Sequence, residues 1–113
     1  MIDLTGKVAI ITGSARGMGK GIAEKLAILG ARVVITDINP EGVEITTEEF
    51  HAKGYLVDSF VSNVADREQA DNLVQFVISK YGKLDILVNN AGINRDAMLH
   101  KMKPEQWDSV ISV

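Results

Sequence analysis

Short apolar runs alternate along the chain with segments in which apolar residues recur at helical spacing. The runs are each short enough to form a buried strand, and they cover residues 8–11, 33–35, 55–61 and 84–88. The helical patterns cover 17–29, a segment that opens with Asn39-Pro40, 66–81 and a segment that opens at Lys103. Strands that alternate with helices indicate an α/β protein with a parallel sheet.

The third helical segment has the clearest inner face, an apolar stripe that we interpret as core. The stripe consists of Ala70, Leu73, Val74, Val77, Ile78 and Tyr81. Asp66 and Gln69 have the spacing of a capping box and mark where this helix begins. The second segment has a weaker inner face formed by Val43, Thr47 and Phe50.

A glycine cluster lies between the first apolar run and the first helical pattern. Gly13, Gly17 and Gly19 leave the backbone without Cβ atoms, so a turn can adopt positive φ and a pyrophosphate can approach the N–H groups at the positive end of the helix. The spacing is neither G-x-G-x-x-G nor a Walker A motif, because other residues stand where those motifs need glycine or a hydroxyl. Two interpretations remain, a dinucleotide-binding loop of another subtype and a plain tight turn.

Asp37 stands at the end of the second apolar run, at roughly the twenty-residue separation from the glycine cluster that places an acid beside an adenosine ribose. A carboxylate there can accept hydrogen bonds from both ribose hydroxyls, and its charge repels a 2′-phosphate. This position favours NAD over NADP. The alternative is a solvated loop carboxylate in front of a helix.

The fourth apolar run leads into two asparagines and two small residues. Asn89 and Asn90 on their own are also common turn formers. In a doubly wound sheet, however, the loops after the first and fourth strands flank the point where a dinucleotide lies. With the glycine cluster upstream, we expect Asn90, Ala91 and Gly92 to lie beside that cofactor.

Composition narrows the classes of function. The 113 residues are 46% hydrophobic and 24% charged with a formal net charge of −3, which does not favour nucleic acid or an anionic membrane as a partner. The chain has no cysteine, and neither a signal peptide nor a membrane span is readable. His51 and His100 lie far apart without carboxylates at metal-ligand spacing, so we expect no metal site. These features predict a cytoplasmic globular protein of at most one domain.

Together the motifs resemble those of the short-chain dehydrogenase/reductase family. The resemblance rests on Thr12-Gly13-Ser-Ala-Arg-Gly17-Met-Gly19 and Asn89-Asn90-Ala91-Gly92, and it runs from Leu4 to Val113. Within the family, Asn63-Val64 and the segment 92–102 look like those of bacterial 3-oxoacyl-[acyl-carrier-protein] reductases and acetoacetyl-CoA reductases. The resemblance implies a Rossmann-type doubly wound parallel sheet with strand order 3-2-1-4. It also implies NAD(P)-dependent carbonyl or alcohol chemistry, with a 3-oxoacyl thioester as substrate.

The resemblance also implies cofactor contacts. The pyrophosphate and the adenosine ribose would be held by Gly13, Ser14, Arg16, Gly17, Met18 and Gly19. The other contacts would be Asp37 to the ribose, Asn63 and Val64 to the adenine, and Asn90, Ala91 and Gly92 to the nicotinamide-side ribose. Arg16 is the basic residue that NADPH-dependent members use near the 2′-phosphate, whereas Asp37 opposes that group. We expect NAD in preference to NADP, because Asp37 stands where the 2′ oxygen must lie and an arginine can also serve the pyrophosphate.

The catalytic residues of the family are the largest departure. A Ser, a Tyr-x-x-x-Lys pair and an Asn carry catalysis in the family, and this chain contains none of them in that pattern. Residues 1–113 therefore look like the amino-terminal, dinucleotide-binding portion of one short-chain reductase domain, with an incomplete sheet. The alternative is a nucleotide-binding or assembly module without catalysis that ends at Val113.

An incomplete sheet has expected consequences. With the order 3-2-1-4, the run 84–88 would present an unpaired apolar edge, and a helix from Lys103 would expose Trp107, Val110 and Ile111. We expect the isolated chain to be marginally stable or to self-associate. For the full enzyme the resemblance implies a homo-oligomer, a tetramer in the family.

Overall fold

The computed structural model describes residues 2–90 and the backbone of residues 109–112. The elements are, in chain order, β1 (Val8–Thr12), α1 (Gly17–Ile28), β2 (Arg32–Thr36), α2 (Pro40–Ala52), β3 (Val57–Ser59), α3 (Arg67–Tyr81), β4 (Ile86–Asn89) and β5 (Ser109–Ser112). The predicted alternation of strands and helices is confirmed from β1 to β4.

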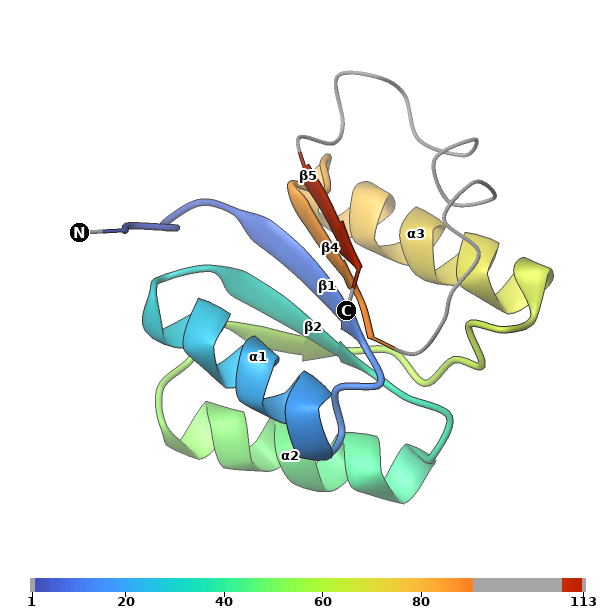
Figure 1. The fold of residues 1–113 in the computed structure, drawn as a ribbon, viewed down its shortest axis with the longest axis horizontal. Coiled ribbons are helices and arrows are strands. Elements are labelled where there is room, and N and C mark those ends of the chain that lie inside the picture. The colour runs from blue at the N-terminus through green and yellow to red at the C-terminus, as the bar shows by residue number, and fades with distance from the viewer. Residues whose placement is uncertain (1, 91–108, 113) are drawn as a thin grey trace.

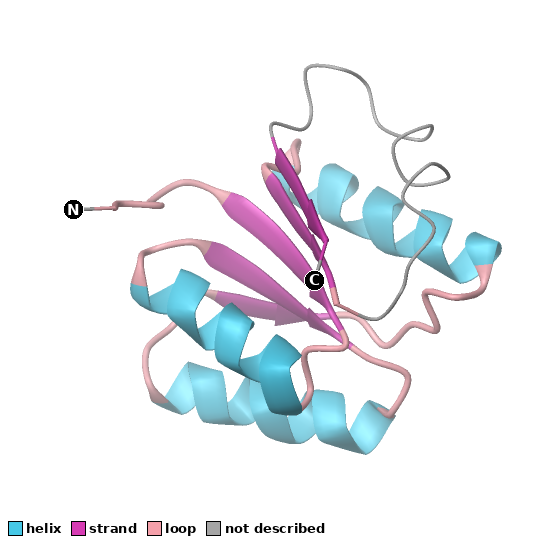
Figure 2. Cartoon of the chain, viewed as in Figure 1, coloured by secondary structure: helices cyan, strands magenta, loops and turns pink. Residues whose placement is uncertain are grey.

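The strands form one parallel sheet in the order β3-β2-β1-β4-β5. Helices α1 and α2 cover one face of this sheet and α3 covers the other (Figure 1). The three layers are seen most directly when helices and strands are coloured by type (Figure 2). The chain changes face after β3, so β1 and β4 lie side by side at the switch point of a doubly wound sheet. The predicted Rossmann-type order 3-2-1-4 is confirmed.

Each face of the sheet has its own hydrophobic core, because successive strand residues point to opposite faces. Ile10, Val34 and Leu87 pack beneath α3, whereas Ile11 and Ile35 pack beneath α1 and α2. All five side chains are buried, which explains why these strands are continuous apolar runs in the sequence. The predicted stripe of α3 is confirmed, since its members are buried or partly buried in that core: Ala70, Leu73, Val74, Val77, Ile78 and Tyr81.

Asp66 is the N-cap of helix α3, as predicted, but only half of the capping box forms. Asp66 Oδ1 accepts hydrogen bonds from Glu68 N at 3.0 Å and from Gln69 N at 3.4 Å. The Gln69 side chain does not reach back to Asp66, because its Oε1 accepts a hydrogen bond from Asn63 N at 2.8 Å. Gln69 thereby attaches the loop after β3 to the first turn of α3.

Strand β3 is shorter than the predicted run 55–61. Tyr55 N donates to the Phe50 carbonyl at 3.1 Å, so residue 55 belongs to the turn that follows α2. Beyond β3, Ser62 N donates to the Asp37 carbonyl at 3.0 Å. The chain after β3 is therefore held against the end of β2 although it is no longer a strand.

Strand β5 corrects two expectations about the end of the chain. It pairs in parallel with β4, with Ser109 opposite Ile86 and Ser112 opposite Asn89, so β4 is not an unpaired edge. Residues 109–112, which include Val110 and Ile111, form a strand where a helix was expected. Pairing satisfies the N–H and C=O groups that an edge strand leaves open, and β-branched residues suit it. Trp107 lies outside the described residues.

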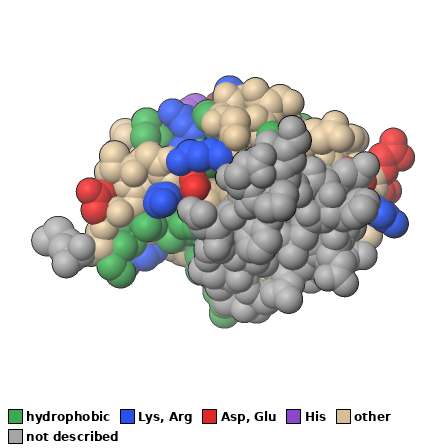
Figure 3. Space-filling view, turned by 90° about the horizontal axis from the view of Figure 1, so that it is seen from above, with side chains coloured by type: hydrophobic (Ala, Val, Ile, Leu, Met, Phe, Trp, Pro, Cys, Tyr) green, Lys and Arg blue, Asp and Glu red, His purple; other side chains and the backbone are tan. Residues whose placement is uncertain are grey.

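The surface carries charges of both signs. In the view from above, Lys and Arg side chains (blue) lie next to Asp and Glu side chains (red) outside the grey region of that face (Figure 3). Across the described part of the chain, none of the helices has the length and apolar character needed to cross a membrane.

A polar cluster beside β3 makes part of the stability depend on pH. Asp58 Oδ2 accepts a hydrogen bond from Tyr81 Oη and pairs with Lys80 Nζ, both at 2.6 Å. Burial raises the pKa of the Asp58 carboxyl, but the hydrogen bonds from Lys80 and Tyr81 outweigh burial and bring the pKa below its ordinary value of 3.8. A carboxyl whose pKa is lowered by folding stabilises the fold above the unfolded-state pKa, and this contribution is lost as the pH falls through the folded-state pKa.

We expect Asp58→Asn to lower the free energy of unfolding at pH 7 by about 1 kcal/mol, because it removes a charge-assisted pair that is partly shielded from water. The difference from the wild type should shrink at acid pH, as the pH falls through the lowered pKa of Asp58 and the wild-type carboxyl also becomes protonated. Urea unfolding at pH 7 and at acid pH measures this. Glu44→Gln, at an exposed position of α2, is the control. An equal loss at both pH values would show that ionisation of Asp58 is not the source.

Candidate functional site

The carboxyl ends of β1, β2 and β4 meet at one edge of the sheet. Thr12 and Thr36 are paired in register at the ends of β1 and β2, and Val88 of β4 is paired with Ile11. Helix α1 starts directly after β1 at this edge (Figure 1). Parallel strands bring the residues that follow them into one place, although those residues are far apart in the sequence.

The loop after β1 and the first turn of α1 need their three glycines, Gly13, Gly17 and Gly19. Gly13 has φ +64° and Gly17 has φ +61°, in the left-handed region that residues with a Cβ avoid. A Cβ on Gly19 would lie 2.6 Å from Asn90 Nδ2 and 2.8 Å from the Gly13 carbonyl carbon, and closer still to the Gly13 oxygen. Helix α1 therefore approaches the loop at Gly19 more closely than any side chain permits.

Thr12 and Asn90 connect this loop to the end of β4. Thr12 Oγ1 donates to the Val88 carbonyl at 3.3 Å and accepts a hydrogen bond from Asn90 N at 2.9 Å. Asn90 Nδ2 donates to the Gly13 carbonyl at 3.3 Å. The Asn90 side chain thus supports the first bend of the loop, in the space that Gly19 leaves open.

Ser14 fastens the same loop to the end of β2. Ser14 N donates to the Thr36 carbonyl at 3.0 Å, and the buried Ser14 hydroxyl accepts a hydrogen bond from Thr36 N at 2.9 Å. Because the Ser14 hydroxyl forms its hydrogen bond within the fold, its role in this structure is to fix the position of the loop.

Asp37 lies beside the loop with both carboxylate oxygens held by the main chain. Oδ2 accepts a hydrogen bond from Ala15 N at 3.2 Å, and Oδ1 accepts one from Ile38 N at 2.8 Å. A carboxylate oxygen can accept more than one hydrogen bond, so both remain able to receive hydroxyl donors. The half-buried Asp37 side chain is therefore an oriented acceptor for a diol.

A cavity of about 200 Å³ adjoins Asp37. The loops after β1, β2 and β3 line it with Gly13, Thr36, Asp37, Ile38, Ser62, Asn63, Val64 and Ala65. Thr36 Oγ1 is buried at this cavity and makes no hydrogen bond with the described residues, whereas buried hydroxyls ordinarily have a partner. Apolar walls, an oriented carboxylate and an unpartnered hydroxyl can accommodate a planar base that carries a sugar.

Helix α1 begins next to the cavity without a side-chain cap. Its N-cap residue, Arg16, makes no side-chain cap hydrogen bond and no acidic residue lies in the first turn, whereas Asn39 caps α2 and Asp66 caps α3. Arg16 and Gly17 are exposed, and Met18 is 70% exposed. Open N–H groups at the positive end of a helix attract an anion, so this end of α1 is suited to a phosphate.

The predicted site residues from Gly13 to Asn90 lie around this one edge, and Ala91 and Gly92 lie outside the described residues. Sequence reasoning gave no role to Thr12 and Thr36, although each is the polar residue that ends an apolar strand. A polar residue at the end of a buried apolar strand could have indicated that these two threonines lie at the site. Within residues 2–90, no group of three or more His, Asp or Glu side chains could hold a metal ion.

Comparison with known proteins identifies the family. A model of the short chain dehydrogenases matches residues 7–113. The chain belongs to the short-chain dehydrogenase family. Among curated relatives, a 3-oxoacyl-[acyl-carrier-protein] reductase of Thermotoga maritima is 47% identical over 97% of this chain. The (2S)-[(R)-hydroxy(phenyl)methyl]succinyl-CoA dehydrogenase subunit BbsD of Thauera aromatica is 44% identical over 99% of it. This short-chain dehydrogenase chain spans 45% of the length of each of the two.

Solved structures confirm the Rossmann-type fold of this short-chain dehydrogenase chain. A hydroxysteroid dehydrogenase from Escherichia coli superposes with a TM-score of 0.76 at 42% identity, over 80% of this chain and 37% of that one. A short chain dehydrogenase/reductase from Burkholderia phymatum, in complex with NAD, gives a TM-score of 0.76 at 35% identity, over 81% of this chain and 33% of that one. The family consists of oxidoreductases that bind a nicotinamide dinucleotide, and this chain corresponds to the cofactor-binding Rossmann region of that fold.

Proposed function

We propose that the chain binds NAD in preference to NADP and forms the cofactor-binding part of an oxidoreductase that interconverts a carbonyl and a secondary alcohol. The bound cofactor would supply or accept a hydride, and the residues of this chain hold and orient it. The observation that carries the proposal is Asp37, a carboxylate fixed by Ala15 N at 3.2 Å beside a cavity of about 200 Å³.

In the proposed arrangement the adenine lies in the cavity against Asn63 and Val64, and the Asp37 carboxylate accepts hydrogen bonds from the ribose hydroxyls. The features that support this fit are the unpartnered Thr36 hydroxyl and the apolar wall that Val64 contributes.

The pyrophosphate lies against the loop and the first turn of α1. The residues there are Gly13, Ser14, Arg16, Gly17, Met18 and Gly19, with Ser14 and Gly19 shaping the loop. The nicotinamide-side ribose lies against Asn90, Ala91 and Gly92. The uncapped start of α1 offers N–H donors for the pyrophosphate, and the absence of a Cβ at Gly19 lets the Asn90 side chain lie beside the Gly13 carbonyl.

The preference for NAD follows from charge. A 2′-phosphate would place about two negative charges next to the fixed Asp37 carboxylate in a partly buried site, where like charges repel more strongly than in water. Arg16 favours the phosphate, but it lies on an exposed segment and can serve the pyrophosphate instead.

We expect NAD to bind the wild-type chain at least about ten-fold more tightly than NADP, and Asp37→Ser to remove this preference, because two charge-assisted hydrogen bonds and one repulsion are lost together. Calorimetric titration with both dinucleotides measures it. Glu44→Ser removes the same charge from an exposed position of α2 and should leave both affinities unchanged. Equal affinity of the wild type for the two dinucleotides would contradict the assigned role of Asp37.

For the substrate we propose a 3-oxoacyl thioester. Two relatives support this substrate class, because one is named for an acyl-carrier-protein substrate and the other for a CoA thioester. A diacetyl reductase of Staphylococcus epidermidis, 41% identical over 95% of this chain, favours a small diketone instead. A protein that continues this chain with the Ser and the Tyr-x-x-x-Lys pair of the family should reduce acetoacetyl-CoA in preference to diacetyl. A preference for diacetyl would overturn the thioester assignment.

The homo-oligomer and the cytoplasmic location stay predictions.

A further inference from the structure

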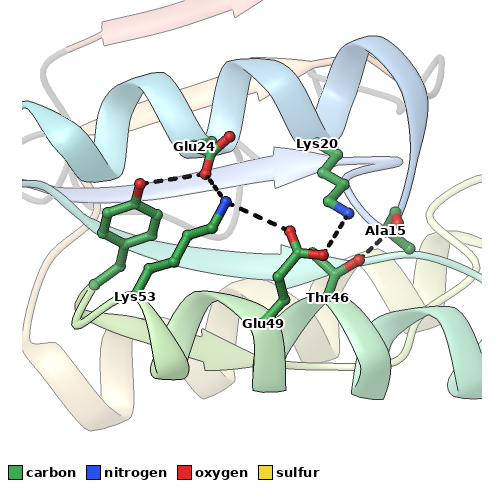
Figure 4. Close-up of polar contacts among 7 residues, drawn as sticks. Ala15, Lys20, Glu24, Thr46, Glu49 and Lys53 are labelled. Carbon is green, nitrogen blue, oxygen red and sulfur yellow. Dashed lines mark hydrogen bonds and ion pairs between the residues drawn. The ribbon is translucent and has the colours of Figure 1, made fainter.

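Helices α1 and α2 lie side by side on one face of the sheet and are joined by polar side chains (Figure 4). Lys20 Nζ of α1 pairs with Glu49 Oε1 of α2 at 3.1 Å. Farther along, Lys53 Nζ lies 2.6 Å from Glu24 Oε2, which also accepts a hydrogen bond from Tyr55 Oη at 3.2 Å. These contacts join the carboxyl-terminal end of α2, and the residues that follow it, to α1.

At the end of this row nearest the glycine loop, α2 contacts the loop itself. The buried Thr46 hydroxyl donates to the Ala15 carbonyl at 2.7 Å (Figure 4). One turn earlier, a Cβ on Gly42 would come within 3.3 Å of Ala15 Cβ, so α2 lies close to the loop here. Ala15 is therefore held on both sides, by Thr46 through its C=O and by Asp37 through its N–H.

The bond from Thr46 also sets the direction of the next N–H group. The peptide bond between Ala15 and Arg16 is planar, and no cis peptide occurs in the described chain, so its C=O and N–H point in opposite directions. Because the Ala15 carbonyl points toward Thr46, the Arg16 N–H points away from α2. Arg16 is the N-cap of α1, so its N–H is among the donors that the helix itself does not use.

We propose that Thr46 is a positioning residue for phosphate recognition: by holding the Ala15 carbonyl, its hydroxyl orients the Arg16 N–H toward the pyrophosphate of a bound dinucleotide. This inference rests on the proposed function and adds to it a residue of α2 that touches no part of the ligand. It separates phosphate binding, which depends on Thr46, from adenosine binding, which depends on the cavity at Asp37.

Thr46→Val tests the proposal, because valine keeps the branched shape of threonine and replaces its hydroxyl with a methyl group that cannot donate a hydrogen bond. Amide chemical-shift titrations of the chain with NAD, ADP and adenosine give three affinities. We expect the variant to bind NAD and ADP about ten-fold more weakly, the effect of losing one charge-assisted hydrogen bond, and adenosine within about two-fold of the wild type. Thr46→Ser, which restores the hydroxyl, should recover most of the affinity for NAD and ADP.

Thr47→Val is the matched control. The buried Thr47 hydroxyl donates to the Val43 carbonyl at 2.7 Å, inside its own helix, so the same substitution one position along removes a similar bond without touching the loop. Its affinities should all stay within about two-fold of the wild type. If Thr46→Val does not fold, Thr46→Ala replaces it in the same comparison.

Two results would overturn the inference alone. Either the Thr46 variant binds NAD and ADP as tightly as the wild type, or it loses adenosine affinity by the same factor, which indicates a general loosening of α2. A wild-type chain that binds none of the three ligands overturns the proposed function, and the inference with it. The wild-type titrations therefore distinguish the two failures.

Discussion

Gly19→Ala is expected to abolish measurable dinucleotide binding and to lower the free energy of unfolding by about 2–3 kcal/mol. The new Cβ would lie 2.6 Å from Asn90 Nδ2 and closer still to the Gly13 oxygen, so α1 must move away from the loop and the Asn90 side chain must turn out. The hydrogen bond from Asn90 Nδ2 to the Gly13 carbonyl breaks in either case. Both the junction with β4 and the start of α1 are then displaced from their positions.

Gly21→Ala is the matched control, two residues along the same helix. A Cβ on Gly21 meets nothing within 4 Å, and the position is exposed. Alanine should raise the free energy of unfolding there by about 0.5–1 kcal/mol through helix propensity, and binding should be unchanged. Urea unfolding and calorimetric titration with NAD measure both variants. If Gly19→Ala binds NAD as the wild type does, the close approach of α1 to the loop is not needed for the site.

Phe50→Ala is expected to have the largest effect on stability, a loss of about 3–5 kcal/mol. Phe50 is fully buried in the core beneath α1 and α2, and its ring packs against that of Tyr55 in a T-shaped arrangement with a centroid distance of 5.4 Å. Alanine leaves a cavity in that core, between the last turn of α2 and the sheet. The free energy of unfolding of a small domain is about 5–15 kcal/mol, so Phe50→Ala would remove a large part of the stability.

Urea unfolding followed by circular dichroism measures the change. Ile45→Ala on the same helix is the control, because Ile45 is 56% exposed and its truncation should change the free energy of unfolding by less than about 0.5 kcal/mol. Phe50→Leu should fall between the two. Equal losses for Ile45→Ala and Phe50→Ala would contradict the inward orientation of Phe50 on α2.

Much of this site could be predicted because local spacing constrains backbone conformation. An apolar run that turns into a glycine cluster is a strand followed by a sharp turn, and Gly13 and Gly17 do have positive φ. The stripe of α3 follows from the period of 3.6 residues, and its members are buried or partly buried as expected. Asp37 could be predicted from its position at the end of β2, whereas Asn63 was linked to the adenine only by the family resemblance; the structure places both in the lining of one cavity.

The errors occurred where a local pattern competes with a longer-range partner. Gln69 has the spacing of a capping box, but Asn63 N, in the preceding loop, takes its side-chain oxygen. Residues 109–112 could continue a helix from Lys103, yet the free edge of β4 offers them strand pairing. The spacing of residues in the sequence does not reveal which of two possible hydrogen-bond partners a polar group will take in the fold.

By itself the sequence determined the order of the elements from β1 to β4, the need for glycine after β1 and an acid at the end of β2, because these depend on backbone geometry and on spacing within one βαβ unit. Only the tertiary structure decided how the site is held together. Ser14 bonds to Thr36 and Thr46 to Ala15, and Asn90 reaches Gly13 across 77 positions of sequence. Those bonds depend on strand register and on how closely α2 packs against α1. Both are set by side chains that meet only after the sheet and its helices have assembled.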